Sequence, residues 1–153
     1  MQNIDILATK LERVVDRLHD DSVNYVAELE IYPVLDYAEK SPIDILNKAL
    51  EGEVIIERVG ISNQQELIAG IRSMLSYEGL GSSHPNKAYV GSDDHGEHLA
   101  ELGSELKSLT SHASSIKQVW LKKGYPFYPV FWDLGFIITI GNDAYVIAGL
   151  ISD

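Results

Sequence analysis

Residues 92–124 read SDDHGEHLAELGSELKSLTSHASSIKQVWLKKG, and the interpretation of the whole fold depends on this stretch. Its apolar residues recur in alternating steps of three and four, the spacing of a helix with one buried face. Acidic residues stand at its start and two lysines near its end, as the helix dipole favours, and Gly124 follows as a left-handed cap. The pattern therefore predicts one long helix over about 92–123. The apolar positions are Leu99, Leu102, Leu106, Leu109, Ala113, Ile116 and Trp120.

This predicted helix has one weak segment, between Thr110 and Ser115. Thr, Ser and His are poor helix formers, and together they cost roughly 2–3 kcal/mol relative to alanine. The helix therefore either spans the protein or breaks here into two packed pieces. The unbroken phase of the apolar positions favours the continuous helix.

Before this stretch, the chain predicts a helical N-terminal layer. Residues 3–19 place apolar side chains on one face and charged side chains on the other. Residues 23–40 also fit a helix, interrupted at Pro33. A third, short helix begins at Ser41, with proline in its first position, and ends at Gly52.

A strand followed by a helix comes next. Residues 53–59 (EVIIERV) are rich in β-branched side chains and lie between glycines, which predicts a strand. Ser62 and Gln65 form a capping-box pattern that opens a helix ending near Tyr77. A short strand over 87–90 is also expected before the long helix.

The C-terminal part predicts a three-stranded antiparallel meander. Its strands are expected at 127–133, 136–140 and 144–151, with a first turn or bulge at Gly135 and a tight turn at 141–143. The last two strands show almost no polar alternation, so we expect both of their faces to be covered by helices or by a partner chain. The fold class is therefore α+β, and the length predicts a single globular domain over 1–153.

The net charge of the chain limits the classes of partner that we expect it to bind. The net charge is −11, from 23 acidic and 12 basic residues. Nucleic acids and anionic membranes are bound through Lys and Arg, so we expect neither as a partner. An acidic field suits solubility, and it also steers association with a basic protein.

Several chemistries are excluded or disfavoured by the sequence. The absence of cysteine removes disulfides, thiolate nucleophiles and cysteine-ligated metals. No phosphate-binding loop, nucleophile elbow or dinucleotide glycine pattern is present, so we expect no bound cofactor. The first twenty residues carry charges throughout and no apolar run reaches the ~18 residues of a membrane span, so we expect a cytoplasmic protein.

The densest polar cluster lies at the start of the predicted long helix. Asp94, His95 and His98 can share one face there, and carboxylate with imidazole can bind zinc or manganese. The spacing of the two histidines differs from that of the HExxH zinc motif. Acidic residues are also favoured in any first helical turn, which is the simpler interpretation.

Aromatic residues concentrate near the C-terminus and suggest a partner surface. Tyr and Trp are enriched at the centres of protein interfaces, although cores also contain them. Asp133 is the carboxylate in this region most suited to partial burial, either as a turn cap or as an acid of raised pKa. The candidate partner-binding residues are Tyr125, Tyr128, Trp132 and Asp133.

Three functional hypotheses follow. The first is a small acidic cytoplasmic protein-binding domain, in its sharpest form an immunity- or antitoxin-type inhibitor of a basic partner. The apolar stretch FWDLGFIITI, residues 131–140, is similar to stretches in small bacterial proteins of the immunity kind. The second is a metal-dependent enzyme built on Asp94, His95 and His98. The third is a homo-oligomeric accessory subunit that associates through its apolar sheet or its long helix. A non-enzymatic role is favoured.

Overall fold

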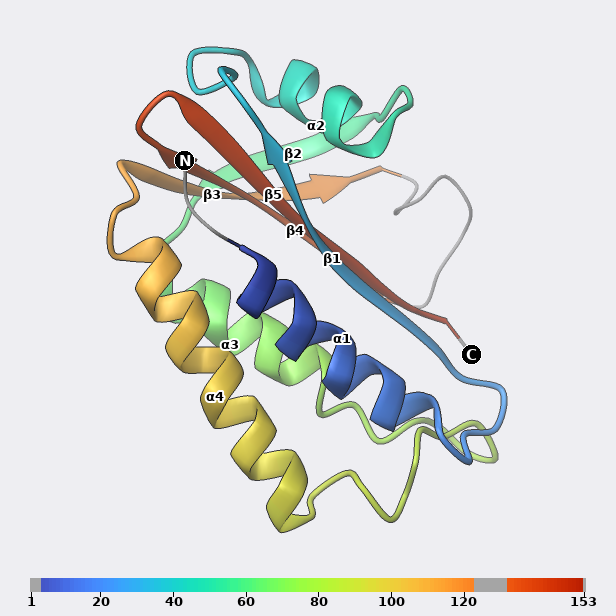
Figure 1. The fold of residues 1–153 in the computed structure, drawn as a ribbon. Helices are drawn as coiled ribbons and strands as arrows, with labels where there is room; N and C mark the ends of the chain where they lie inside the picture. Colours follow the sequence, from blue (N-terminus) through green and yellow to red (C-terminus); the bar gives the residue numbers. More distant parts are fainter. Residues whose placement is uncertain (1–3, 123–131, 153) are drawn as a thin grey trace.

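An antiparallel β-sheet with helices on both faces forms the framework of the protein (Figure 1). The structure, a computed structural model, describes residues 4–122 and 132–152. Over these residues the elements in chain order are α1 (Asp5–His19), β1 (Val26–Val34), α2 (Pro42–Leu50), β2 (Ile56–Ile61), α3 (Gln64–Met74), α4 (Asp93–Thr110), β3 (Ser115–Leu121), β4 (Trp132–Ile140) and β5 (Asp143–Ser152).

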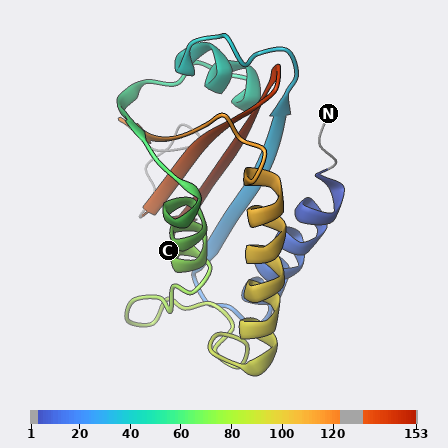
Figure 2. The same ribbon diagram turned by 90° about the vertical axis from the view of Figure 1, so that its left-hand side faces the viewer.

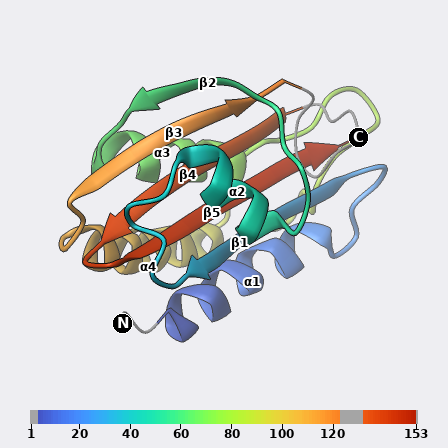
Figure 3. The ribbon, with the colours of Figure 1, turned by 90° about the horizontal axis from the view of Figure 1, so that it is seen from above.

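The sheet has five strands among these residues, in the order β1-β5-β4-β3-β2, and every neighbouring pair is antiparallel. The β4–β5 hairpin lies at its centre, and β1 and β2 form its two edges. Residues 144–151 of β5 are all buried, because helices cover the sheet from both sides (Figures 1 and 3). The expectation that the apolar C-terminal strands are covered on both faces is therefore confirmed.

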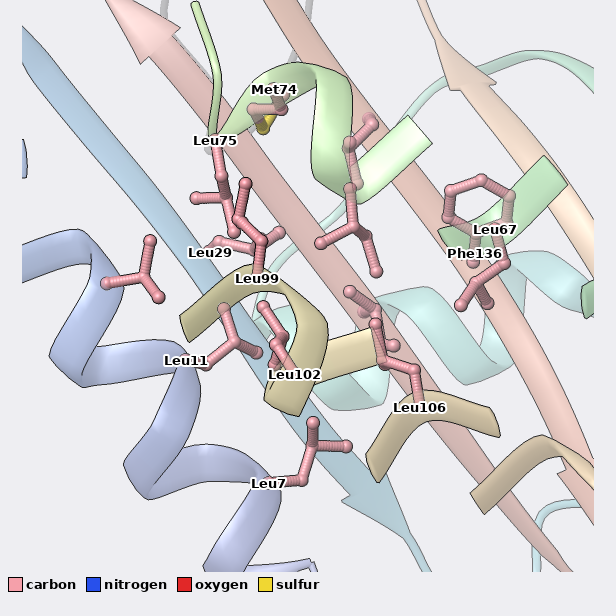
Figure 4. Close-up of a cluster of buried hydrophobic side chains, with 14 of the residues drawn as sticks. Leu7, Leu11, Leu29, Leu67, Met74, Leu75, Leu99, Leu102, Leu106 and Phe136 are labelled. Carbon is pink, nitrogen blue, oxygen red and sulfur yellow. The ribbon is translucent and has the colours of Figure 1, made fainter. Parts of the chain in front are cut away.

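The main core lies between the sheet and the layer formed by α1, α3 and α4 (Figures 2 and 4). Leucines of α1 and α4 meet side chains of α3 and of the sheet there, as Figure 4 shows. A second, smaller core lies under α2 on the opposite face. The labelled members of the main core are Leu7, Leu11, Leu29, Leu67, Met74, Leu75, Leu99, Leu102, Leu106 and Phe136.

The predicted continuous helix over 92–123 is wrong, because the chain breaks within its weak segment. Helix α4 ends at Thr110, whose hydroxyl donates to the carbonyl oxygen of Leu106 at 2.8 Å. Serines and a histidine follow, and the chain resumes as strand β3 at Ser115. Ile116 and Val119, with the β-branched side chains typical of strands, then pair with β4 and β2. The apolar spacing crosses the break by coincidence.

The prediction of helix over 23–40 is also wrong, since residues 26–34 form strand β1. Their burial alternates, with Ala27 and Leu29 buried and their neighbours exposed. This is the two-residue period of a strand with one face on the core. The N-terminal layer is therefore helix–strand–helix, and β1 pairs with β5 across most of the sequence.

Two smaller predictions need correction. Residues 87–90 form turns instead of a strand. Gly135 is neither a turn nor a bulge but lies inside β4, in unbroken register with Ala148. Glycine suits this position because a Cβ there would lie 2.8 Å from Val119 Cγ2. The predicted three-stranded meander therefore understates the sheet. Of its first strand, residues 127–131 lie outside the described residues.

Other local predictions are confirmed. Helix α1 and the βα unit of β2 and α3 form as expected, and α2 begins at Pro42 with the Ser41 hydroxyl accepting from the amide of Asp44. The cap of α3 shifts by one residue, since Asn63 accepts the Glu66 amide in place of the predicted Ser62. Of the helices in the described ranges, none is long and apolar enough for a membrane crossing.

The close contact of β5 with β1 can be tested at Gly149. An added Cβ would lie 2.5 Å from Leu29 Cδ1 and 2.8 Å from the carbonyl oxygen of Glu28. Gly149→Ala should therefore lower the free energy of unfolding by about 1–3 kcal/mol, measured by urea denaturation. The control is Gly96→Ala on α4, where nothing lies within 4 Å of the new Cβ and stability should rise slightly. Equal midpoints for the two variants would contradict this packing.

Candidate functional site

A groove of about 510 Å³ runs between α1 and the outer edge of β1. Figure 3 shows α1 lying alongside this edge strand. The groove forms because α1 buries only its leucine face against the sheet. The adjacent face of the helix lies beside the outer edge of β1 and is left exposed there. The lining residues are Ala8, Leu11, Glu12, Val15, Asp16 and His19 of α1 and Ala27, Glu28, Leu29, Glu30 and Ile31 of β1.

The strand wall of the groove offers backbone hydrogen-bonding groups. Within the described residues β1 pairs with β5 alone, so its other edge has no strand beside it. The amide of Ala27 points outward and donates to His19 Nε2 at 3.0 Å. In an antiparallel pair the outward direction recurs at every second residue, so the amides of Leu29 and Ile31 also face the groove. An extended peptide could pair with this edge.

The groove is acidic. Glu12 and Asp16 line it from α1, and Glu28 and Glu30 line it from β1; all four residues are exposed. Neither Lys nor Arg occurs among the lining residues that the structure describes. Four carboxylates along one hollow produce a negative field that attracts cationic groups.

The lysine and the two arginines that α1 directs to ion pairs are turned away from this groove and toward α4. Over residues 4–122 and 132–152, three ion pairs connect the two helices, each with partly exposed side chains. The hydrogen bond from Arg13 also lowers the pKa of Glu101. Glu12 and Asp16 on the other face of α1 therefore share the groove with His19 but with no lysine or arginine of their own helix. The pairs are Lys10–Glu105 (3.0 Å), Arg13–Glu101 (2.6 Å) and Arg17–Asp94 (3.7 Å).

His95, one of the candidate metal ligands, is buried, and both of its ring nitrogens are engaged by backbone. Nε2 donates to the carbonyl oxygen of Leu75 at 3.0 Å, and Nδ1 accepts from the amide of Gly91 at 3.0 Å. Burial lowers the pKa of His95, and the hydrogen bond to Leu75, which favours the protonated ring, offsets only part of this effect. The ring is therefore a neutral bridge that anchors α4 to the end of α3.

The other two candidate ligands have different surroundings. His98 Nδ1 lies 2.8 Å from the hydroxyl of Tyr89, a buried residue whose pKa is raised mainly by burial and which therefore stays protonated. Asp94 is exposed and pairs with Arg17 at 3.7 Å. In the part of the chain that the structure describes, no three His, Cys, Asp or Glu residues gather as metal ligands would. The geometry thus gives the metal hypothesis no support.

The candidate partner-binding residues near the C-terminus are only partly described. Tyr125 and Tyr128 lie outside the described residues, and Trp132 opens β4 opposite Ile151. Asp133 is half-buried and contributes to a second hollow, of about 320 Å³, between α3 and the β3–β4 side of the sheet. None of these residues lines the acidic groove.

The groove was not predicted from the sequence, because one of its walls was interpreted as a helix. The signal was the alternation of apolar and polar residues from Ala27 to Ile31. Asn86 was missed as well. Its side chain donates to the carbonyl of Arg17 and accepts from the amides of Ala88 and Tyr89, so it ties the 75–92 segment to the end of α1.

Comparisons with known proteins add little. No protein-family model matches the chain, and no curated protein matches it in sequence. Among solved structures, the crystal structure of citrus MAF1 is similar over 95% of this chain and 98% of that chain, at 13% identity and a TM-score of 0.40. A likeness this distant carries no functional argument.

The buried neutral state of His95 predicts an acid-dependent loss of stability. Its pKa in the folded protein lies below the ordinary value of 6.5. As the pH falls below 6.5, His95 binds a proton in the unfolded chain but stays neutral in the folded protein, so the free energy of unfolding decreases. Urea denaturation between about pH 7.5 and pH 5 measures this slope.

The variant His95→Gln should show a shallower pH slope than the wild type, and it should also be less stable. His112→Gln removes an exposed histidine and serves as the matched control. An unchanged slope in His95→Gln would show that other groups cause the acid sensitivity.

Proposed function

We propose that this chain is a small acidic protein-binding domain whose α1–β1 groove holds a basic segment of a partner protein. The observation that supports the proposal is the combination of an open strand edge with four exposed carboxylates along one groove. A strand edge supplies affinity through main-chain hydrogen bonds, and the surrounding charge selects the partner.

The positions of the carboxylates indicate what the bound segment looks like. A strand added beside β1 sends alternate side chains to opposite faces of the sheet. On the α1 side these side chains would meet Glu12 and Asp16. On the other side they would meet Glu28 and Glu30, since the alternate residues Ala27 and Leu29 face the core. The preferred ligand is therefore an extended segment with Lys or Arg on both of its faces.

An immunity- or antitoxin-type inhibitor is the more specific form of this proposal. Toxins that act on nucleic acid carry basic surfaces, because phosphate binding depends on Lys and Arg. A protein of net charge −11 would associate quickly with such a surface and would compete with the nucleic acid for it. The small size of the chain and its acidic groove support this form.

The groove can be tested with a cationic probe peptide of alternating Lys and Val. Titration calorimetry should show binding to the wild type that weakens as salt is added. The triple variant Glu12→Gln/Glu28→Gln/Glu30→Gln should bind roughly tenfold more weakly, since each exposed charge pair contributes about 0.2–1 kcal/mol.

A matched control separates the groove from overall charge. The variant Glu39→Gln/Glu53→Gln/Glu78→Gln removes three exposed carboxylates that do not line the groove. It should bind the peptide nearly as well as the wild type. Equal weakening in both triple variants would mean that the peptide responds only to net charge, which would contradict a specific groove.

Whether the probe peptide pairs with β1 as an added strand can be tested separately. N-methylation of peptide amides at alternate positions removes hydrogen-bond donors from one edge only. Methylation on the edge that faces β1 should abolish binding, whereas methylation on the opposite edge should leave it intact. Indifference to the methylated edge would rule out pairing with β1.

A test of the inhibitor function requires the natural partner protein. A basic protein that co-purifies with the chain from its native host should lose its activity when the wild-type chain is added, and it should keep that activity with the groove triple variant. Recovery of no basic protein would count against the inhibitor.

A further inference from the structure

We infer that β2, the opposite edge of the sheet, pairs with β2 of a second copy and joins the two sheets across a two-fold axis. This interface is separate from the acidic groove and does not depend on the proposed function. Within residues 4–122 and 132–152, β2 pairs with β3 alone, so its outer edge is open (Figure 3). Exposed strand edges of natural proteins are usually protected by lysine, proline or an early end of the strand.

The edge strand β2 has a bulge between Ile56 and Arg58, but two of its exposed side chains beyond the bulge are apolar. Its sequence, IERVGI, contains neither lysine nor proline. Ile61 is 93% exposed and Val59 is 38% exposed. Both residues lie on the α2 face of the sheet, because Val59 pairs with Val119, a member of the core under α2. Two neighbouring apolar side chains on an open strand edge form the kind of surface on which another strand can pair.

The direction of the backbone groups on β2 follows from its pairing with β3. The amide of Ser62 donates to the carbonyl oxygen of Ile116 at 2.8 Å and so points toward β3. By the alternation of an antiparallel ladder, the amides and carbonyls of Ile61 and Val59 point away from β3, to the outside. These two residues are therefore the ones that can bond to an added strand.

One antiparallel register suits two copies best, and it places the two-fold axis at Gly60. Val59 of each copy then lies opposite Ile61 of the other, so four exposed apolar side chains form one cluster. With the axis at Val59, Glu57 would face Ile61 instead. With the axis at Arg58, two arginines would face each other, which is unfavourable. Of these three registers, the side chains favour the one centred on Gly60.

The charged residues on the other face of β2, away from Val59 and Ile61, also favour the register centred on Gly60. It places Arg58 of one copy opposite Ser62 of the other. The hydroxyl of Ser62 donates to Glu66 Oε2 at 3.0 Å, so a carboxylate lies beside it. The guanidinium of Arg58 is held above the ring of Trp120, 3.8 Å from the ring centroid. Two Arg58–Glu66 pairs would therefore form across the axis, as the self-complementarity of a two-fold interface requires.

Cysteine pairing tests this register directly, because the chain has no cysteine of its own. Residues that pair through hydrogen bonds across antiparallel strands have Cα atoms about 5.5 Å apart, within the range of a disulfide. A mixture of Val59→Cys with Ile61→Cys should therefore form a disulfide-linked dimer under mild oxidation. Either variant alone should form much less of it.

The control replaces the second cysteine with one at a distant exposed position. Ile6 on α1 is 57% exposed, and a mixture of Val59→Cys with Ile6→Cys should give only background cross-linking. Absence of the dimer from the 59–61 mixture, or equal yields in both mixtures, would overturn the proposed pairing.

Sedimentation equilibrium at increasing concentration measures the association without cross-linking. The wild type should shift from the mass of one chain toward that of two. Ile61→Lys should abolish the shift while leaving the fold intact, because this side chain is already exposed. Leu80→Lys, at an exposed leucine outside β2 (69%), should associate like the wild type. A wild type that stays monomeric at every concentration would refute the dimer.

The charge pairs provide a rescue experiment. Arg58→Glu and Glu66→Arg should each weaken association, since each leaves two like-charged pairs across the axis. The combination Arg58→Glu/Glu66→Arg restores opposite charges at both pairs and should recover much of the lost association. A combined variant weaker than both single variants would contradict the register.

Discussion

The buried pairing of β4 with β5 is the interaction on which the rest of the structure depends. The two strands run in continuous register from Trp132 opposite Ile151 to Ile140 opposite Asp143, and β5 is apolar on both faces. A hairpin of this kind has no side that can face water, so the protein must cover it twice. The layer of α1, α3 and α4 covers one face and α2 helps to cover the other. This arrangement leaves the edges of the sheet as the places where the backbone can still form new hydrogen bonds.

The two edges differ in chemistry because their neighbours differ. Beside β1, helix α1 directs its basic side chains to the glutamates and aspartate of α4 and leaves Glu12 and Asp16 for the groove. Beside β2, Val59 and Ile61 remain uncovered. One sheet therefore presents an acidic edge and an apolar edge. The first is the edge that we propose for a basic partner, and the second is the edge that we propose for another copy of the same chain.

Sequence patterns predicted those elements whose structure is decided locally. The amphipathic spacing of α1, the Ser41–Pro42 start of α2 and the tight turn after Ile140 each carry their own signal, and each was found, the turn being one residue shorter than predicted. The predictions for residues 26–34 and 115–121 were wrong because the structure of these segments is not decided locally. The apolar positions of 115–121 fit a helix as well as a strand, and the alternation within 26–34 is short, so pairing with residues far along the chain decides the structure of both segments. The groove was missed with β1. At the head of α4, His95 was identified but its role was not, since its partner Leu75 lies twenty residues away in the sequence and becomes its neighbour only in the folded protein.

The pairing of β1 with β5 also has a consequence for how the protein reaches its structure. Val26 lies opposite Ser152, so the edge strand must close a loop that contains most of the chain before it gains its hydrogen bonds. Closure of long loops is entropically unfavourable, and folds dominated by such distant contacts form slowly. During synthesis, β1 and the face of α1 that packs beneath it leave the ribosome long before β5 exists. The acidic groove is therefore among the last features of the molecule to be completed.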